Sequence, residues 1–248
     1  MIKKVLLAFP KITNLGFGFP FLKALILLNI FTINLLYAQN KNPEETLVKI
    51  SDDIFMLKDM EINTSVKTIT IPCVINMASG LIEVVLCRPE GKAHESLLTT
   101  KVSPIEFQTA ILLLGLDPVN EMPDDPSKAD PLSPYKTIET PGDSVLMFIE
   151  FDRAGTVVRE PIESFIRDER TKSALKQTTW LFKGAVTHQS DHVLVDPNVT
   201  MISTYFDPVA LMEINNSSKF NDELFYVNEA AGLTKGQSVK LIIQSYRN

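Results

Sequence analysis

Hydrophobic and polar positions divide the chain into short runs typical of strands and one run typical of a helix. Residues 66–71 are β-branched at all but one position, and an apolar run over 73–77 continues the pattern after Pro72. Residues 81–87 return after Gly80, so these runs predict a hairpin, and Pro72 indicates an edge strand or a bulge. Further strands are predicted at 144–151, 156–159, 178–184, 192–195, 199–205 and 238–246.

The helical run covers 104–114. Ser103 can cap it, Pro104 suits its first position, Glu106 lies in its first turn and Gly115 follows its end. Most of this helix should be buried. One face is apolar, and two further leucines widen this apolar face: the face carries Phe107, Ala110, Ile111 and Leu114, and the two leucines are Leu112 and Leu113. Two further short helices are predicted at 161–168 and 207–212.

Many strands, few helices and no regular βαβ alternation favour an α+β fold. We expect a single domain over 61–248, mostly antiparallel, with one apolar helix after the first hairpin and one or two short helices. A flexible segment is expected at 39–60. Residues 116–143 form a long loop rich in Pro and Asp, whose acids either face solvent or bind Ca²⁺, although their spacing fits no EF-hand.

The first 38 residues have the pattern of a secretory signal peptide. Four lysines precede the apolar run 24–37, residues 36–38 resemble a cleavage site, and no acid precedes Glu44. The run is shorter than the roughly 20 residues that span a bilayer, so no stable membrane span is expected after cleavage. We therefore predict a mature chain that begins near Gln39 and is periplasmic or secreted.

Cleavage would remove four of the 24 basic residues and none of the 30 acidic ones, which leaves a net charge near −10. A chain this acidic, without a basic run, is a poor partner for phosphate groups. Nucleic-acid binding is therefore not expected, and anionic membrane surfaces are disfavoured for the same reason.

Two cysteines, Cys73 and Cys87, lie on the two strands of the predicted hairpin. An oxidising compartment would allow a disulfide between them, although directly opposed strand positions often give a strained bridge. Two small buried thiols are the alternative, and a functional thiol is the third interpretation.

The densest group of reactive residues is the loop that carries Lys92, His94, Glu95 and Ser96. His94 could move protons or bind metal, but a neighbouring Glu95 in an extended loop would point the other way. The simpler interpretation is that His94 bonds a backbone carbonyl, while Lys92 and Glu95 form an exposed ion pair. Ser96 as a nucleophile with His94 as its base lacks the usual elbow motif and an oxyanion donor.

Two weaker candidate sites lie further along the chain. His188 and His192 could join His94 in a zinc site, although their segment reads as a loop between strands. Trp180 and Phe182 share one strand face and could line a ligand pocket, but such a pair is more often part of a core.

The segment GLIEVVLCRPEGKAHESLL at 80–98, with the helix that ends before Gly115, resembles the YdjY-like domain of exported bacterial proteins. The resemblance continues through the hairpin at 145–159, the strand TWLFKG at 179–184 and the segment LTKGQSV at 233–239. It implies no established activity and assigns no role to Lys92, His94 or Glu95. Residues 185–188 depart from the family, which tends to have small polar residues there.

These observations favour an exported soluble domain that acts as a binding or assembly module of the bacterial envelope, with an unknown protein or small-molecule ligand as its partner. The rival is a small hydrolase or a metal-dependent enzyme that uses Lys92, His94 and Glu95. No cofactor is indicated by any motif.

Overall fold

The computed structural model describes residues 47–118, 142–184 and 199–246. The chain divides into two units at Thr46, and every described residue belongs to the second, Thr46–Asn248. The predicted signal peptide (1–38), most of the loop 116–143 and the strand predicted at 192–195 lie outside the described residues.

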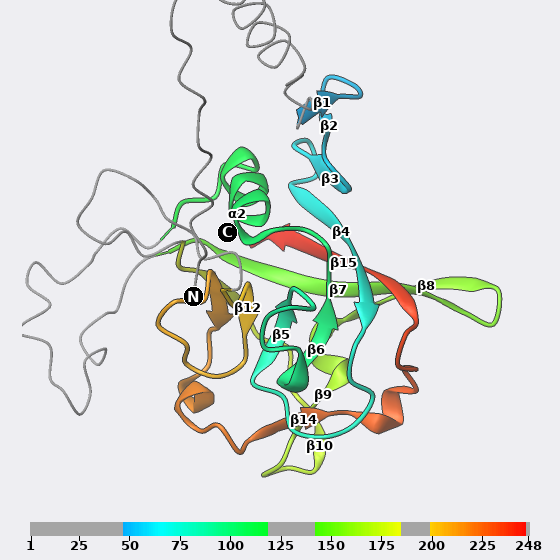
Figure 1. The fold of residues 1–248 in the computed structure, drawn as a ribbon, viewed down its shortest axis with the longest axis vertical. Helices are drawn as coiled ribbons and strands as arrows, with labels where there is room; N and C mark the ends of the chain where they lie inside the picture. Colours follow the sequence, from blue (N-terminus) through cyan, green and yellow to red (C-terminus); the bar gives the residue numbers. More distant parts are fainter. Residues whose placement is uncertain (1–46, 119–141, 185–198, 247–248) are drawn as a thin grey trace, which may run out of the picture. The chain divides into compact units, whose positions relative to one another are not determined.

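The second unit is built on a sheet that closes on itself (Figure 1). Around the ring each strand pairs with the next, and the last, β6, pairs back with β4. The eight strands form a closed barrel, in which β12–β13 and β5–β6 are parallel pairs and the other pairs are antiparallel. In ring order they are β4 (Thr68–Ile75), β15 (Ser238–Ser245), β7 (Ser144–Arg153), β11 (Trp180–Phe182), β13 (Met212–Ile214), β12 (Ile202–Ser203), β5 (Val84–Cys87) and β6 (Ser96–Thr99).

The fold is therefore mostly β, and the α+β class expected from the sequence is wrong. Within the described ranges α2 (Pro104–Leu113) is the one α-helix. Where a helix was expected at 161–168, the chain forms the 3-10 turn η3 (Ile162–Phe165) and the strand β9 (Ile166–Asp168). The expected helix at 207–212 is a turn that leads into β13. Residue periodicity predicts which faces are buried, but it does not determine which strand edges meet.

The hairpin expected around Gly80 does not form, because β6 lies between β4 and β5. Leu98 of β6 pairs with Ile75 on one side and with Leu86 on the other. Gly80, with a φ of 98°, still turns the chain, but it turns it toward β14 (Phe225–Val227). There the amide of Ile82 donates to Phe225 and the amide of Val227 donates to Gly80, both at 2.9 Å.

Pro72 lies where β4 changes partners. The edge of β4 that faces away from β15 pairs with β3 (Met60–Asn63) over residues 68–70 and with β6 over residues 74–75. Residues 71–73 pair with neither β3 nor β6, which leaves a gap in the hydrogen bonding of this edge. Pro72 lies in the gap and has no N–H group that would remain unpaired there. Its carbonyl accepts a hydrogen bond from the Thr100 hydroxyl at 2.8 Å, so the gap leaves no polar group of Pro72 unsatisfied.

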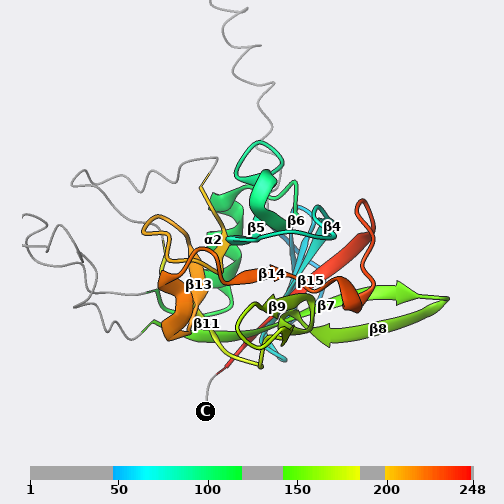
Figure 2. The same cartoon turned by 90° about the horizontal axis from the view of Figure 1, so that it is seen from below.

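Two additions extend the barrel wall. β1 (Leu47–Lys49) and β2 (Ile54–Leu57) continue the sheet beyond β3, within the segment expected to be flexible. β8 (Thr156–Pro161) pairs with β7, and the β7–β8 hairpin projects away from the rest of the fold in both views (Figure 2). β1 and β8 therefore have outer edges that pair with no described strand.

The predicted helix is confirmed as α2, but its buried face is narrower than predicted, because Leu112 and Leu113 are exposed. Ser103 and Glu106 form a reciprocal capping box, and Gly115 follows the helix with a φ of 82°. Phe107, Ala110 and Ile111 are completely buried in the hydrophobic core. Across the described ranges, no helix combines the length and the apolar character that a transbilayer segment requires.

A three-stranded sheet lies at the end of the barrel away from α2 (Figures 1 and 2). It has the order β10-β9-β14, with β10 at Ser173–Ala174. The hydrophobic core is continuous from this end of the barrel to α2, because it contains Phe165, Phe225 and Val227 as well as the buried side chains of the helix. The remaining short elements are the 3-10 turns η1 (Ala93–Glu95), η4 (Ser217–Phe220) and η5 (Glu229–Ala231).

Candidate functional site

The reactive loop is a tight corner between β5 and β6, which are parallel neighbours. Its turn η1 is tied to the end of β4, because the Asn76 amide donates to the carbonyls of Ala93 and of Ser96, the latter at 2.8 Å. The amide of Glu83 also donates to the Glu95 carbonyl at 3.1 Å. Hydrogen bonds from the Asn76 side chain and from the Glu83 backbone therefore hold the corner in place.

The 3-10 turn brings Lys92, His94 and Glu95 together. The Glu95 carboxylate lies 3.8 Å from Lys92 Nζ and 3.6 Å from His94 Nε2. An extended loop would have separated His94 from Glu95, but in this turn the two side chains meet. The His94 side chain is 79% exposed and Glu95 only 20%, so the imidazole lies on the solvent side of the carboxylate.

Ser96 faces the opposite way. Its side chain is completely buried, and its hydroxyl donates to the Leu98 carbonyl at 2.8 Å. The structure thus places the Ser96 hydroxyl inside the barrel wall and the His94 imidazole in solvent. It does not bring them together as a nucleophile and its base.

The corner continues into an ion-pair network that the sequence analysis missed. Lys92 Nζ lies 3.3 Å from Asp207 Oδ2, and Lys183 Nζ donates to the Asp207 carbonyl at 2.6 Å. Lys183 also donates to Glu213 Oε2 at 3.2 Å, and Lys219 donates to the other oxygen of Glu213. We call these five residues the Lys92–Lys219 network. One sequence signal was available: Glu213 is a lone acid in an apolar run, and buried acids are almost always paired.

Burial controls the electrostatics of this network. The Glu213 side chain is 4% exposed and that of Lys183 is 16% exposed. Desolvation lowers the pKa of Lys183, and the Glu213 carboxylate opposes this shift. The Phe206 ring lies beside both ammonium groups, 5.3 Å from Lys183 Nζ and 5.8 Å from Lys219 Nζ. Three cations and two carboxylates thus satisfy one another next to an aromatic ring.

Desolvation also raises the pKa of Glu83, and the charge of the nearby Glu95 raises it further. Lys92 opposes this effect, although less strongly than Glu95 promotes it. The corner therefore combines Glu83 and Glu95 with Lys92 and the exposed imidazole of His94. Glu95 and Lys92 shift the pKa of Glu83 in opposite directions.

The barrel strands and the corner lie almost entirely within one family match. The family model of the YdjY domain matches residues 60–244. The chain belongs to the YdjY domain family. No curated protein and no solved structure matches the chain. The matched range begins at β3 and ends one residue before the end of β15, so it includes the closed barrel except for Ser245, and β1 and β2 precede it.

Trp180 and Phe182 lie in the interior of the YdjY domain. Both side chains are completely buried, and the Trp180 indole donates to Glu163 Oε1 at 2.9 Å. Glu163 is 2% exposed, and desolvation raises its pKa while the Trp180 hydrogen bond opposes the shift. These two rings pack in the core and line neither of the two hollows discussed below.

Cys73 and Cys87 are free thiols, and both are buried. They lie on β4 and β5 with β6 between them, so two strand spacings of about 4.8 Å separate their strands. That separation exceeds the Cα distance of about 7 Å that a disulfide tolerates. Burial raises the pKa of Cys73 to about 12, which makes its thiolate scarce at neutral pH.

The remaining metal candidates fall partly outside the described residues. His188, His192 and the acids of 119–141 lie there, so the structure does not place them. Among the residues that are described, no three His, Cys, Asp or Glu side chains gather closely enough to hold a metal ion.

Proposed function

We propose that this YdjY domain is an exported binding module of the bacterial envelope and has no catalytic activity of its own. The observation that carries the proposal is the pairing of the reactive groups with one another. Glu95 is shared by Lys92 and His94, Lys92 also reaches Asp207, and the Ser96 hydroxyl is bonded inside the wall. Such a corner presents a fixed surface rather than a poised nucleophile.

One contact supports the rival function. The exposed His94 imidazole lies 3.6 Å from the Glu95 carboxylate, and a hydrolase could use such a pair as a general base. The two functions make different predictions for His94. A surface residue of a binding module can be removed without cost to folding, and no turnover depends on it.

The test compares His94→Ala with Asn76→Ala in the purified mature chain. We expect His94→Ala to melt within a few degrees of wild type, because its side chain is exposed. Asn76→Ala should lower the stability by about 1–3 kcal/mol, because two carbonyls lose their donor. Esterase and phosphatase assays and elemental analysis of each protein complete the comparison.

A turnover that wild type shows and His94→Ala loses, at unchanged melting temperature, would reject the binding module in favour of the hydrolase. A stoichiometric metal lost in His94→Ala would favour the metal-dependent enzyme.

Export is tested separately, through the N-terminus. We expect the full chain, expressed in a bacterium with an outer membrane, to appear in the periplasmic fraction with Gln39 as its first residue. A cytoplasmic protein of full mass would contradict this part of the proposal.

A further inference from the structure

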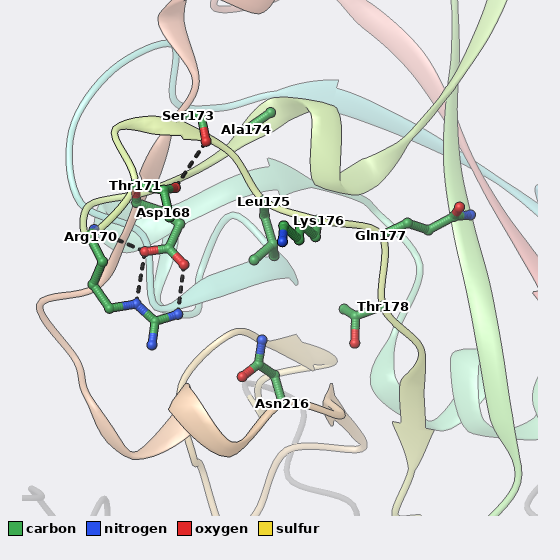
Figure 3. Close-up of a pocket in the computed structure, with 10 residues that line it drawn as sticks. All are labelled: Asp168, Arg170, Thr171, Ser173, Ala174, Leu175, Lys176, Gln177, Thr178 and Asn216. Atoms are coloured by element: carbon green, nitrogen blue, oxygen red, sulfur yellow. Dashed lines mark hydrogen bonds and ion pairs between the residues drawn. The ribbon is translucent and has the colours of Figure 1, made fainter.

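A pocket of about 300 Å³, lined mostly by polar and charged residues, lies beside the three-stranded sheet (Figure 3). We call it the Arg170 pocket. One wall is the segment 168–178, which runs through β10 and on toward β11, and Asn216 faces this segment from the start of η4. It is separate from the Lys92–Lys219 network, none of whose residues lines it.

Arg170 is held in a fixed orientation at this pocket. Its Nε donates to Asp168 Oδ1 at 3.0 Å and its Nη2 to Asp168 Oδ2 at 2.6 Å. Nη1 donates to the Ser218 hydroxyl at 2.7 Å. A guanidinium has five N–H groups, so one N–H remains on each terminal nitrogen. The Arg170 side chain is 56% exposed, whereas that of Asp168 is 8% exposed. The buried acid therefore orients a guanidinium whose remaining donors are accessible.

Asn216 adds a neutral donor across the pocket. The backbone amide of Ser218 donates to Asn216 Oδ1 at 2.9 Å, which fixes the oxygen on that side. The amide nitrogen must then point the other way, and Figure 3 shows it facing the segment of Leu175 and Lys176. The Asn216 side chain therefore offers N–H groups to the space that Arg170 borders.

The local charge is positive in an acidic chain. Of the charged residues that line the pocket, Arg170 and Lys176 are basic and Asp168 is acidic, whereas the whole chain has a net charge of −6. A second hollow of about 840 Å³ lacks this bias, because its rim carries Lys58, Lys101 and Lys240 beside Asp59, Glu150 and Asp152. Positive charge and donor groups thus coincide at the smaller site.

We propose that the Arg170 pocket binds a small organic carboxylate, whose oxygens accept from the free N–H groups of Arg170 and from the Asn216 amide. A planar carboxylate matches donors on a planar guanidinium. The exposed Lys176 adds long-range attraction, and Leu175 and Ala174 give the ligand an apolar contact. Asp168 lies on the same guanidinium and would repel a phosphate dianion more strongly than a monoanion. The inference deepens the proposed binding function by naming a ligand class.

The test is calorimetric titration of the mature chain with glucuronate and diglycine. Glucose and glycylglycinamide are their matched controls without a carboxylate, and inorganic phosphate is the competing anion. We expect saturable binding of at least one carboxylate, weakened by added salt, and no binding of its matched control. Amide NMR shifts at Leu175 and Thr178 should report the site.

Two variants separate binding from folding. Asn216→Asp keeps an oxygen for the Ser218 amide but replaces the donor with a negative charge, so carboxylate affinity should fall about tenfold or more. Lys176→Gln should weaken binding about threefold and reduce its salt dependence, through loss of one exposed charge. Lys235→Gln, an exposed lysine outside the pocket, is the control and should bind as wild type does.

Three results would overturn the proposal: no carboxylate binding at tens of millimolar, equal binding of glucuronate and glucose, or unchanged affinity in folded Asn216→Asp. Phosphate binding tighter than any carboxylate would overturn the ligand class. Export and the stability of the Lys92 corner are measured independently, so the proposed function and this site can fail separately.

Discussion

Individual buried charges in this protein are satisfied by partners from other strands and turns of the fold. Glu213 on β13 accepts from Lys183 after β11 and from Lys219 in η4, and Glu163 in η3 accepts from Trp180 on β11. Each partner removes part of the cost of placing a carboxylate in a poorly hydrated interior. These side chains therefore couple the barrel wall to the turns that surround it.

At Glu213, the loss of charge should be costly. Glu213→Gln leaves Lys183 in a buried position without its carboxylate, and we expect the free energy of unfolding to fall by about 3 kcal/mol. Glu150→Gln is the matched control, because it breaks the exposed pair with Lys240 and should cost less than about 1 kcal/mol. Equal costs in urea denaturation would contradict this ranking.

At Glu163, the cost of burial should depend on pH. Its pKa is raised, so the folded state retains the proton over a range in which the unfolded state has lost it. Stability should therefore decrease as the pH rises from the ordinary glutamate pKa of 4.5 to the raised value, and then stay constant.

Glu163→Gln cannot lose this proton and still offers an oxygen to the Trp180 indole. We expect its stability relative to wild type to increase with pH across that range, as measured by urea denaturation at a series of pH values. A difference that is independent of pH would show that Glu163 is not held with a raised pKa.

Among the elements, β4 shows how a strand can serve two partners on one edge. Its first half pairs with β3 and its end with β6, and Pro72 lies at the change. The sequence predicted an edge or a bulge there. The structure instead has a gap in the ladder, which costs little because proline has no N–H and Thr100 bonds its carbonyl.

Thr100→Val should therefore destabilise the junction. The substitution keeps the shape of the side chain but leaves the Pro72 carbonyl without its donor, at a cost of about 1–3 kcal/mol. Thr70→Val is the control, because Thr70 lies on β4 with Pro72 but takes no part in this hydrogen bond, and the substitution should change the stability less. Thermal unfolding of the two variants tests this, and a Thr100→Val protein as stable as wild type would refute the role of the hydroxyl.

At the scale of the whole molecule, closure of the ring distributes stability unevenly. β15 pairs along its length with β4 and β7, whereas β1 pairs only with β2 and β8 only with β7. Strands with two neighbours lose their hydrogen bonds only when the wall opens, whereas an outer strand can separate alone.

Hydrogen exchange should follow this difference. We expect amides of β15 and β4 to exchange most slowly, and amides of β1 and of the free edge of β8 to exchange fastest. Mass spectrometry of exchanged peptides measures this directly. Rapid exchange in β15 would be inconsistent with a closed barrel.

The prediction from sequence succeeded where the signal was local. Ser103, Glu106 and Gly115 defined α2 because capping depends on neighbouring residues, and short apolar runs predicted β7 and β15 because strand-forming residues are grouped there. The Lys92 corner was found as a cluster because its members are consecutive. Asp207, Lys183 and Glu213 were missed, because their contacts join strands and turns that are remote in sequence.

Residue types and short spacings were enough to predict the family, the capped helix, most of the long strands and the residues that could carry chemistry, since none of these depends on contacts between remote segments. Only the tertiary structure decided that β6 lies between β4 and β5 and closes the ring, that Cys73 and Cys87 are two strands apart, and that Glu95 faces both Lys92 and His94. The physical reason is that strand pairing is a competition among all available edges, and its outcome depends on the packing of the whole core rather than on any one segment.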